Sequence, residues 1–267
     1  MTDEGERAMK HPVYFVGAGP GDPELITVKG KRLLQEADRV VYAGSLVPEA
    51  LLEDCRPGAA IFDSAPLTLL ETHALLRTGY HDGERVVRLH TGDPALYGAI
   101  REQMDLLDEE GIPHEVVPGV SVVFAAAAAL KRELTVPEVS QTVILTRMGG
   151  RTQVPDRENL GSLASHGATL AIYLSVQQIE KVAAEVVPHY PPETPVVVAY
   201  RVGWPDQAFV YGTLADVAQK VRSAGINRQA VILIGKVFGK QAGDEPKRSK
   251  LYDESFSHGF RERGEPS

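Results

Sequence analysis

The sequence of 267 residues contains a single cysteine, Cys55, and a single tryptophan, Trp204. One cysteine excludes a disulfide within the chain and a cysteine-rich metal site, and it is compatible with a reducing cytoplasm. We predict that Cys55 is a half-buried loop thiol rather than a nucleophile, and that Trp204 belongs to a core. The histidines show no ligand spacing, so we expect no metal bound by the protein.

Long apolar runs and clusters of basic residues are also missing. No run reaches the roughly 18 apolar residues that a membrane span needs, and residues 1–10 are polar, unlike a signal peptide. The net charge is −8, with lysine and arginine scattered along the chain, which argues against a nucleic-acid partner. We therefore expect a cytoplasmic protein with neither a membrane nor a nucleic-acid partner, although a few local arginines can still bind a small anion.

What the sequence does contain is a repeated order of strand, turn and helix. Hydrophobic residues make up 43% of the chain, enough for one large core or two smaller ones. In the first half, apolar runs of strand type occupy residues 13–16, 39–42, 85–89 and 115–117. Asp22 with Pro23, and Asp93 with Pro94, are predicted to open helices directly after two of these strands. The pattern predicts an α/β fold with a largely parallel sheet.

The second half is richer in strands and predicts a smaller mixed sheet with helices on it. Strands are expected at 142–145, 169–174, 195–200, 208–211 and 230–234, and helices at 160–165, 177–187 and 214–224. A polar stretch around Pro137 separates the halves. The predicted organisation is an N-terminal tail (1–11), an N-terminal α/β domain (12–132), a linker (133–140), a C-terminal α/β domain (141–240) and a polar tail (241–267).

Three turns of the first half are candidates for a binding site, at residues 17–22, 91–97 and 117–121. Each follows a strand, and ligands bind at the carboxyl edge of an open parallel sheet. Glycines let the backbone approach a ligand, and helix starts offer free N–H groups. Any one of these turns alone is equally consistent with an ordinary connection.

The first turn does not match the fingerprint of a dinucleotide-binding site. That fingerprint, Gly-x-Gly-x-x-Gly, needs a glycine at position 22, where this chain has Asp22. Pro20 and Pro23 also remove N–H donors where a pyrophosphate needs them. A nucleotide-binding oxidoreductase is therefore disfavoured.

Taken together, the three turns resemble those of the tetrapyrrole methylase family. The motifs are Gly-Ala-Gly-Pro-Gly-Asp-Pro at 17–23, Thr-Gly-Asp-Pro at 91–94 and Pro-Gly-Val-Ser at 118–121. The resemblance runs from about Val13 to Lys236.

A narrower similarity connects the chain to the subgroup that methylates C11 of precorrin-4 or cobalt-precorrin-4 in cobalamin biosynthesis. It rests on residues 42–48, 145–152 and 203–206, with Leu-Tyr-Asp at 251–253. Siroheme-forming relatives carry an aspartate where this chain has Ala43, a departure that argues against uroporphyrinogen as the substrate.

The resemblance implies two α/β domains with the cofactor site in the cleft between them, and a homodimer. The implied methyl donor is S-adenosylmethionine, with S-adenosylhomocysteine as product, and Asp93 is expected to be its polar anchor. Carried over to matching positions, the donor contacts are Pro20, Thr91, Gly92, Asp93, Leu96, Ser121, Val122, Leu174, Val202 and Ala230. No general base is assigned, because methyl transfer from a sulfonium mainly requires alignment of the reacting atoms.

The implied substrate is an anionic tetrapyrrole that carries several carboxylates. Arginines bind carboxylates through paired hydrogen bonds, and three arginines lie next to the motifs. The candidate substrate contacts are Ser45, Arg88, Arg147 and Arg151. Two further alternatives remain open at this stage: a relative of the same fold that methylates diphthine or ribosomal RNA, and a binding module that keeps the donor pocket without catalysis.

Overall fold

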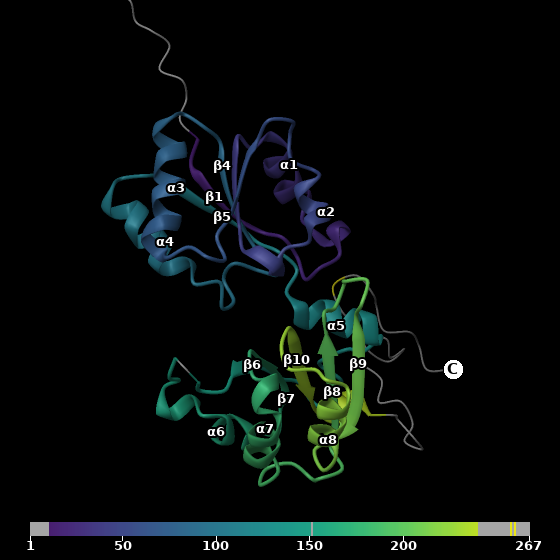
Figure 1. Cartoon of the computed structure of the whole chain (residues 1–267). Helices are drawn as coiled ribbons and strands as arrows, with labels where there is room; N and C mark the ends of the chain where they lie inside the picture. The colour runs from purple at the N-terminus through teal and green to yellow at the C-terminus, as the bar shows by residue number, and fades with distance from the viewer. Residues whose placement is uncertain (1–10, 151, 240–256, 258, 260–267) are drawn as a thin grey trace, which may run out of the picture. The chain divides into compact units, whose positions relative to one another are not determined.

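The computed structural model describes residues 11–150, 152–239, 257 and 259. The chain forms two compact units (Figure 1). Within the described residues, the first unit comprises the chain up to Ala125 together with Arg201–Gln207, and the second comprises the rest. The domain boundaries inferred from the sequence, with a linker at 133–140, stay a prediction.

The first unit is built on a five-stranded parallel sheet of order β3-β2-β4-β1-β5. The strands are β1 (Val13–Gly17), β2 (Arg39–Tyr42), β3 (Ala60–Asp63), β4 (Val86–His90) and β5 (His114–Val117). The predicted parallel sheet is confirmed, and β3 is an additional edge strand. Every residue of the central strand β4 is buried, as expected for a parallel sheet covered on both faces.

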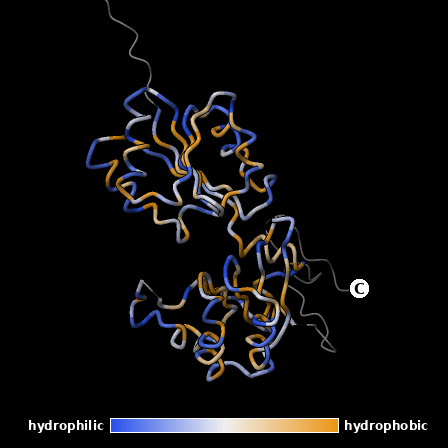
Figure 2. Tube along the Cα trace, viewed as in Figure 1, coloured by the Kyte–Doolittle hydropathy of each residue, from blue (hydrophilic) through white to orange (hydrophobic). Residues whose placement is uncertain are grey.

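Helices cover both faces of this sheet, as Figure 1 shows. One core contains Leu33 and Leu51 of α1 (Val28–Glu36) and α2 (Glu49–Leu52). The other contains Leu76 and Leu107 of α3 (Leu69–His81) and α4 (Ile100–Glu109). The 3-10 turns η1 (Pro23–Leu25) and η2 (Gly44–Leu46) also belong to this unit, and α5 (Val122–Leu130) begins in the first unit and ends in the second. Figure 2 shows hydrophobic residues concentrated along the strands.

Of the two predicted helix starts, the one at Asp22 and Pro23 opens only a short 3-10 turn, and the one at Asp93 and Pro94 is wrong. The Asp22 carboxylate accepts a hydrogen bond from Glu24 N (2.9 Å), but it caps only η1, and α1 begins later, after Thr27. Asp93 likewise accepts from Ala95 N (2.8 Å), yet α4 begins only at Ile100. The intervening segment cannot be helical, because Tyr97 and Ala99 have φ of 58° and 49°.

The second unit contains a five-stranded mixed sheet of order β6-β7-β10-β8-β9, which confirms the prediction. Its strands are β6 (Val143–Arg147), β7 (Thr169–Tyr173), β8 (Pro195–Tyr200), β9 (Ala208–Thr213) and β10 (Ala230–Ile234). Only the β6–β7 pair is parallel among these described strands. One core lies between the sheet and three helices, α6 (Leu160–Ala164), α7 (Ile179–Val186) and α8 (Val217–Ser223). The unit also contains the 3-10 turns η3 (Asp156–Glu158), η4 (Val176–Gln178) and η5 (Lys236–Phe238).

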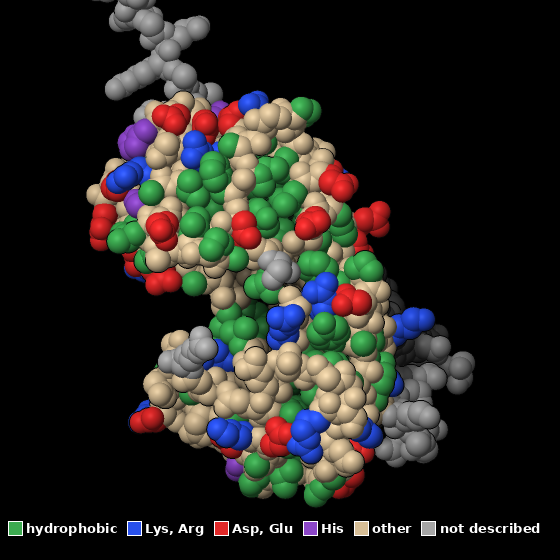
Figure 3. Space-filling view, in the orientation of Figure 1, with side chains coloured by type: hydrophobic (Ala, Val, Ile, Leu, Met, Phe, Trp, Pro, Cys, Tyr) green, Lys and Arg blue, Asp and Glu red, His purple; other side chains and the backbone are tan. Residues whose placement is uncertain are grey.

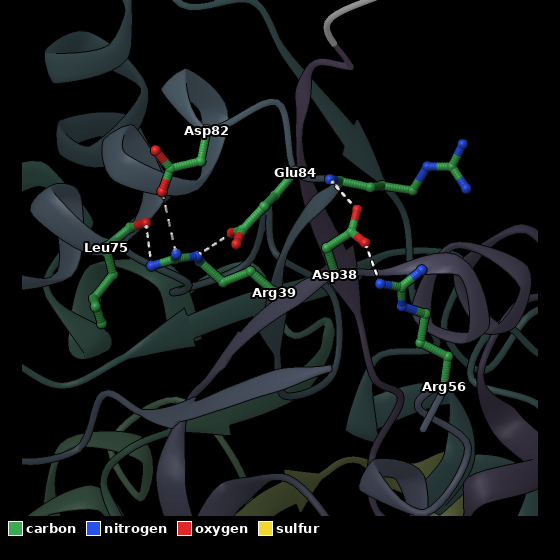
Figure 4. A network of polar contacts seen from close by, with 7 residues as sticks. Asp38, Arg39, Arg56, Leu75, Asp82 and Glu84 are labelled. Carbon is green, nitrogen blue, oxygen red and sulfur yellow. Dashed lines mark hydrogen bonds and ion pairs between the residues drawn. The ribbon is translucent and has the colours of Figure 1, made fainter. Parts of the chain in front are cut away.

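A network of charged residues ties the amino ends of β2 and β4 together (Figure 4). The Arg39 guanidinium donates to Glu84 Oε2 (2.5 Å) and to the Leu75 carbonyl (3.4 Å). The Asp38 carboxylate accepts from Arg85 N (2.7 Å) and pairs with Arg56 (2.5 Å). This network braces the end of the sheet opposite to the three candidate turns.

Candidate functional site

The three candidate turns follow adjacent strands of the first sheet, β4, β1 and β5. The first two turns are joined through their backbones: Gly19 N donates to the Gly92 carbonyl (3.2 Å), and Gly92 N donates to the Gly19 carbonyl (2.7 Å). Ala18 N also donates to the His90 carbonyl at 2.7 Å. The carboxyl edge of the sheet is therefore one connected backbone surface.

Two glycines, Gly17 and Gly119, allow these strand ends to approach one another. A Cβ on Gly119 would lie 2.1 Å from the Gly92 carbonyl oxygen and 2.8 Å from Gly17 Cα. A Cβ on Gly17 would lie 2.6 Å from Gly119 Cα. Real side chains do not tolerate such distances to backbone atoms, so glycine at Gly17 and Gly119 is required by close packing. A Cβ on Gly92, in contrast, would meet nothing within 4 Å, so the surface above Gly92 is open.

Asp93 links the second turn to the third. Its Oδ1 accepts from Ala95 N at 2.8 Å, and its Oδ2 accepts from Gly119 N at 3.0 Å. The carboxylate is only half-buried, which leaves it accessible to a ligand. Asp93 therefore organises the site in addition to its predicted role as the polar anchor of the donor.

The third turn leads into α5, whose first backbone groups lie at this edge. Ser121 is buried, and its carbonyl accepts from Phe124 N (3.1 Å) and Ala125 N (3.3 Å). Val122, the first residue of α5, is half-buried. Together with buried Pro20 and half-buried Thr91 and Leu96, these residues place the predicted donor contacts of the first half on one edge.

The other three predicted donor contacts come from the second half of the sequence. Val202 is buried and lies in the 201–207 segment, which belongs to the first unit. Leu174 directly follows β7, and Ala230 begins β10, both in the second unit. Leu174 has φ of 54° and is 74% exposed. An exposed leucine in the left-handed region is a costly arrangement that is common at functional sites.

The candidate substrate contact Arg88 lies inside the first unit. It is buried, with Nε donating to Gln103 Oε1 (3.0 Å) and Nη1 donating to the Val41 carbonyl (3.2 Å). Burial lowers the pKa of Arg88 to about 10, so the side chain stays charged at neutral pH with two neutral partners. Gln103 was not predicted as a partner of Arg88. Its position on the apolar stripe of α4, with Ile100, Met104 and Leu107, does indicate a buried polar side chain that needs a hydrogen-bond partner.

Of the other substrate candidates, Arg147 ends β6 in the second unit and Ser45 follows β2 in the first. Arg147 donates to the carbonyls of Met148 (3.2 Å), Thr152 (3.0 Å) and Gln153 (3.0 Å), and so organises its own loop. Arg151 lies outside the described residues. Ser45 lies in η2, and its side chain is outside the part of the chain that the structure describes. Their contacts with a substrate stay predictions.

His90 ends β4 immediately before the second turn. Its ring stacks on Phe15 with centroids 5.9 Å apart, and its Nε2 has no hydrogen-bond partner among the described residues. Burial and the nearby charge of Arg88 lower the pKa of His90 to about 3. His90 is therefore neutral in the folded protein.

Cys55 agrees with the prediction of a half-buried loop thiol. Burial raises the pKa of its thiol, which disfavours the reactive thiolate.

On the face shown in Figure 3, basic side chains are spread out rather than gathered into one patch. Within the described residues, no group of three histidine, cysteine or acidic side chains is placed to hold a metal. Nor does any described helix have the length and apolarity needed to cross a membrane.

The sequence matches the family described as tetrapyrrole (corrin/porphyrin) methylases over residues 12–218. It is 51% identical to cobalt-precorrin-4 C(11)-methyltransferase of Methanocaldococcus jannaschii, over 93% of this chain and 95% of that protein. It is 49% identical to precorrin-4 C(11)-methyltransferase of Pseudomonas aeruginosa, over 93% of this chain and 98% of that protein.

Two solved structures show the same arrangement of elements. A cobalamin biosynthetic enzyme, cobalt precorrin-4 methyltransferase, superposes with a TM-score of 0.83 at 50% identity, covering 85% of this chain and 95% of that one. Uroporphyrin-III C-methyl transferase from Thermus thermophilus, complexed with S-adenyl homocysteine, superposes with a TM-score of 0.73 at 31% identity, covering 90% and 99%.

Proposed function

Because this chain belongs to the tetrapyrrole (corrin/porphyrin) methylases, we propose that it transfers the methyl group of S-adenosylmethionine to C11 of precorrin-4 or cobalt-precorrin-4 in cobalamin biosynthesis. S-adenosylhomocysteine is the second product. One relative is named for cobalt-precorrin-4 and another for precorrin-4, and each is about half identical to the chain over nearly its whole length. The observation that carries the proposal is the connected edge of three glycine turns, with an open surface above Gly92.

The edge has the properties that S-adenosylmethionine requires of a binding site. The donor has a polar amino-acid end and ribose hydroxyls, which suit the exposed portion of the Asp93 carboxylate and the backbone groups of Thr91 and Gly92. Its adenine suits apolar residues such as Leu96 and Val122. The sulfonium supplies an already activated methyl group.

The residues of the chain contribute mainly by orientation. Methyl transfer needs the attacking ring carbon, the methyl carbon and the sulfur in line, and ideal positioning is worth at most about 7–11 kcal/mol. The turns supply a rigid backbone surface, because Gly17, Gly92 and Gly119 are in contact and Asp93 fixes two of the turns. The tetrapyrrole carbon is itself nucleophilic, so no strong general base is required.

We propose that Ser45, Arg88, Arg147 and Arg151 serve the tetrapyrrole, whose carboxylates need cationic partners. Arg147 is the most informative of the described candidates, because its guanidinium is only half-buried at the end of β6. The buried position of Arg88 supports an indirect contribution, through the shape of the chain between β4 and α4. We also propose a cytoplasmic homodimer, which rests on the family resemblance.

The experiment that tests the proposal offers precorrin-4 and cobalt-precorrin-4 side by side with S-adenosylmethionine labelled in its methyl group. Label at C11 is the expected result, and the faster substrate identifies the form used. Label at another ring carbon contradicts the assignment of C11. Intact donor binding with transfer to neither substrate redirects the assignment to uroporphyrinogen, diphthine or ribosomal RNA.

A further inference from the structure

The segment of residues 201–207 is the connection between the antiparallel strands β8 and β9 of the second unit. It nevertheless belongs to the first unit. The chain leaves the second unit after Tyr200, contributes Arg201–Gln207 to the first, and returns at Ala208. We call this segment the 201–207 loop. Its partner within the first unit is the first candidate turn.

Contacts between the 201–207 loop and the first turn are close and specific. Trp204 Nε1 donates a hydrogen bond to the Pro20 carbonyl oxygen at 3.1 Å, across 184 residues of sequence. A Cβ on Gly21 would lie 2.2 Å from Cδ1 and 2.4 Å from Nε1 of the indole. A Cβ on Gly203 would lie 2.6 Å from Asp22 N. The two segments therefore pack with glycine on each side, where no side chain fits.

The indole is held in place by the rest of its own loop. The Arg201 guanidinium lies 4.1 Å from the centre of the indole, close enough for a cation–π interaction. Arg201 Nε donates to Asp206 Oδ1 at 2.7 Å, and Gly203 N donates to Gln207 Oε1 at 3.1 Å. Trp204 thus presents its N–H from a fixed position, unlike the core tryptophan that the sequence suggested.

The first turn needs such an external restraint. Gly19, with φ of +79°, and Gly21 flank Pro20, and glycines permit rotation of the intervening peptide groups. Gly19 is held by its hydrogen bonds to Gly92. The Pro20 carbonyl is held by Trp204 Nε1. Because a peptide unit is planar, the orientation of this carbonyl also sets the direction of the Gly21 N–H in the same turn.

We infer that Trp204 is a positioning residue for the methyl donor, because its indole N–H fixes the Pro20 carbonyl and thereby the shape of the first turn. This inference rests on the proposed function, in which the first turn contacts S-adenosylmethionine. The 201–207 loop would then contribute to donor binding in two ways, through the predicted contact of Val202 and through the effect of Trp204 on the first turn. Trp204 itself need not touch the donor.

The variant Trp204→Phe tests the inference, because phenylalanine keeps an aromatic ring and lacks the N–H. A matched control is Tyr190→Phe, which removes another aromatic donor to a backbone carbonyl, that of Ala168 in the second unit. We expect the dissociation constant of S-adenosylmethionine, measured by calorimetry, to rise about two- to tenfold in Trp204→Phe, the worth of one hydrogen bond. It stays unchanged in Tyr190→Phe. Equal donor affinity in Trp204→Phe and the unmodified protein overturns the inference.

A measurement on the unmodified sequence guards against a variant that fails to fold. Trp204 is the only tryptophan, so protein grown with fluorotryptophan gives one fluorine NMR resonance. Addition of S-adenosylhomocysteine is expected to shift that resonance in proportion to occupancy. A resonance that stays in place while calorimetry records binding overturns the inference alone. Absence of donor binding in calorimetry overturns the proposed function, and the inference with it.

Discussion

Asp93 offers the sharpest test of how the site is assembled, because its two carboxylate oxygens serve different turns. Asp93→Ala leaves Ala95 N and Gly119 N without their acceptors. A hydrogen bond to a charged group contributes about 1.5–3 kcal/mol to stability, and water replaces part of this at a half-exposed site. We therefore expect the free energy of unfolding to fall by about 2–3 kcal/mol for the two bonds together. Asp93→Asn retains one acceptor oxygen and should lose about half as much.

Donor affinity distinguishes two roles of Asp93: joining the turns, and binding the donor directly through its carboxylate. Asp93→Ala is expected to abolish binding of S-adenosylmethionine while the protein remains folded. If the carboxylate also holds the donor, Asp93→Asn loses at least about tenfold in affinity, because the charge is gone. If Asp93 only joins the turns, Asp93→Asn keeps most of the affinity. Calorimetry with the donor and urea unfolding followed by circular dichroism measure the two quantities.

Asp216→Ala is the matched control for Asp93→Ala. The Asp216 carboxylate accepts from Thr213 N at 2.7 Å and pairs with Lys220 at 2.7 Å, in the second unit. Its removal should lower stability by a similar amount and leave donor affinity unchanged. A folded Asp93→Ala variant that binds the donor as tightly as the unmodified protein would refute the assignment of Asp93 to the donor site.

Three further substitutions test other parts of the site. Gly119→Ala places a Cβ against backbone atoms, so we expect a loss of about 1–3 kcal/mol in stability and weaker donor binding. The control is Gly161→Ala, whose Cβ would make ordinary contacts in α6 and should raise the stability by up to about 1 kcal/mol. His90 has a folded pKa of about 3, below the roughly 6.5 of an unfolded histidine. The unfolded state therefore takes up a proton first as pH falls, and stability drops by up to about 1.4 kcal/mol per pH unit between about pH 6 and about pH 4. Urea unfolding across this range should show a shallower drop for His90→Leu. Arg147→Ala should weaken tetrapyrrole binding in a spectroscopic titration and spare the donor; unchanged affinity for both would restrict Arg147 to holding its own loop.

Several elements could be predicted because their signals are local. The apolar runs of β1, β2, β4 and β5 end at glycine turns, so their positions followed directly. Helix α3 also has a local signal, because Thr68 and Glu71 form a capping box at its start, although it was not among the predicted helices. Strand β3 is short and half-exposed at the sheet edge, which leaves it a weak pattern.

Other features had no local signal. The start of α4 is delayed by left-handed φ values at Tyr97 and Ala99, and neither residue type announces that conformation. Buried Arg88 donates a hydrogen bond to Gln103, which lies 15 residues later in the next helix. The Trp204–Pro20 hydrogen bond joins residues 184 positions apart, and no periodicity or turn rule connects them. Contacts of this kind arise from tertiary packing alone.

The joined turns explain why three short motifs together predict a site that none of them predicts alone. Each motif by itself is an adequate strand-to-helix connection. In the folded protein, Gly19 and Gly92 exchange hydrogen bonds, Asp93 accepts from Gly119 N, and Gly119 packs against Gly17. A change in one motif therefore alters the backbone of the other two. The specificity of the motif set has a physical origin: it encodes one continuous surface, assembled from backbone groups and a single carboxylate, rather than three separate loops.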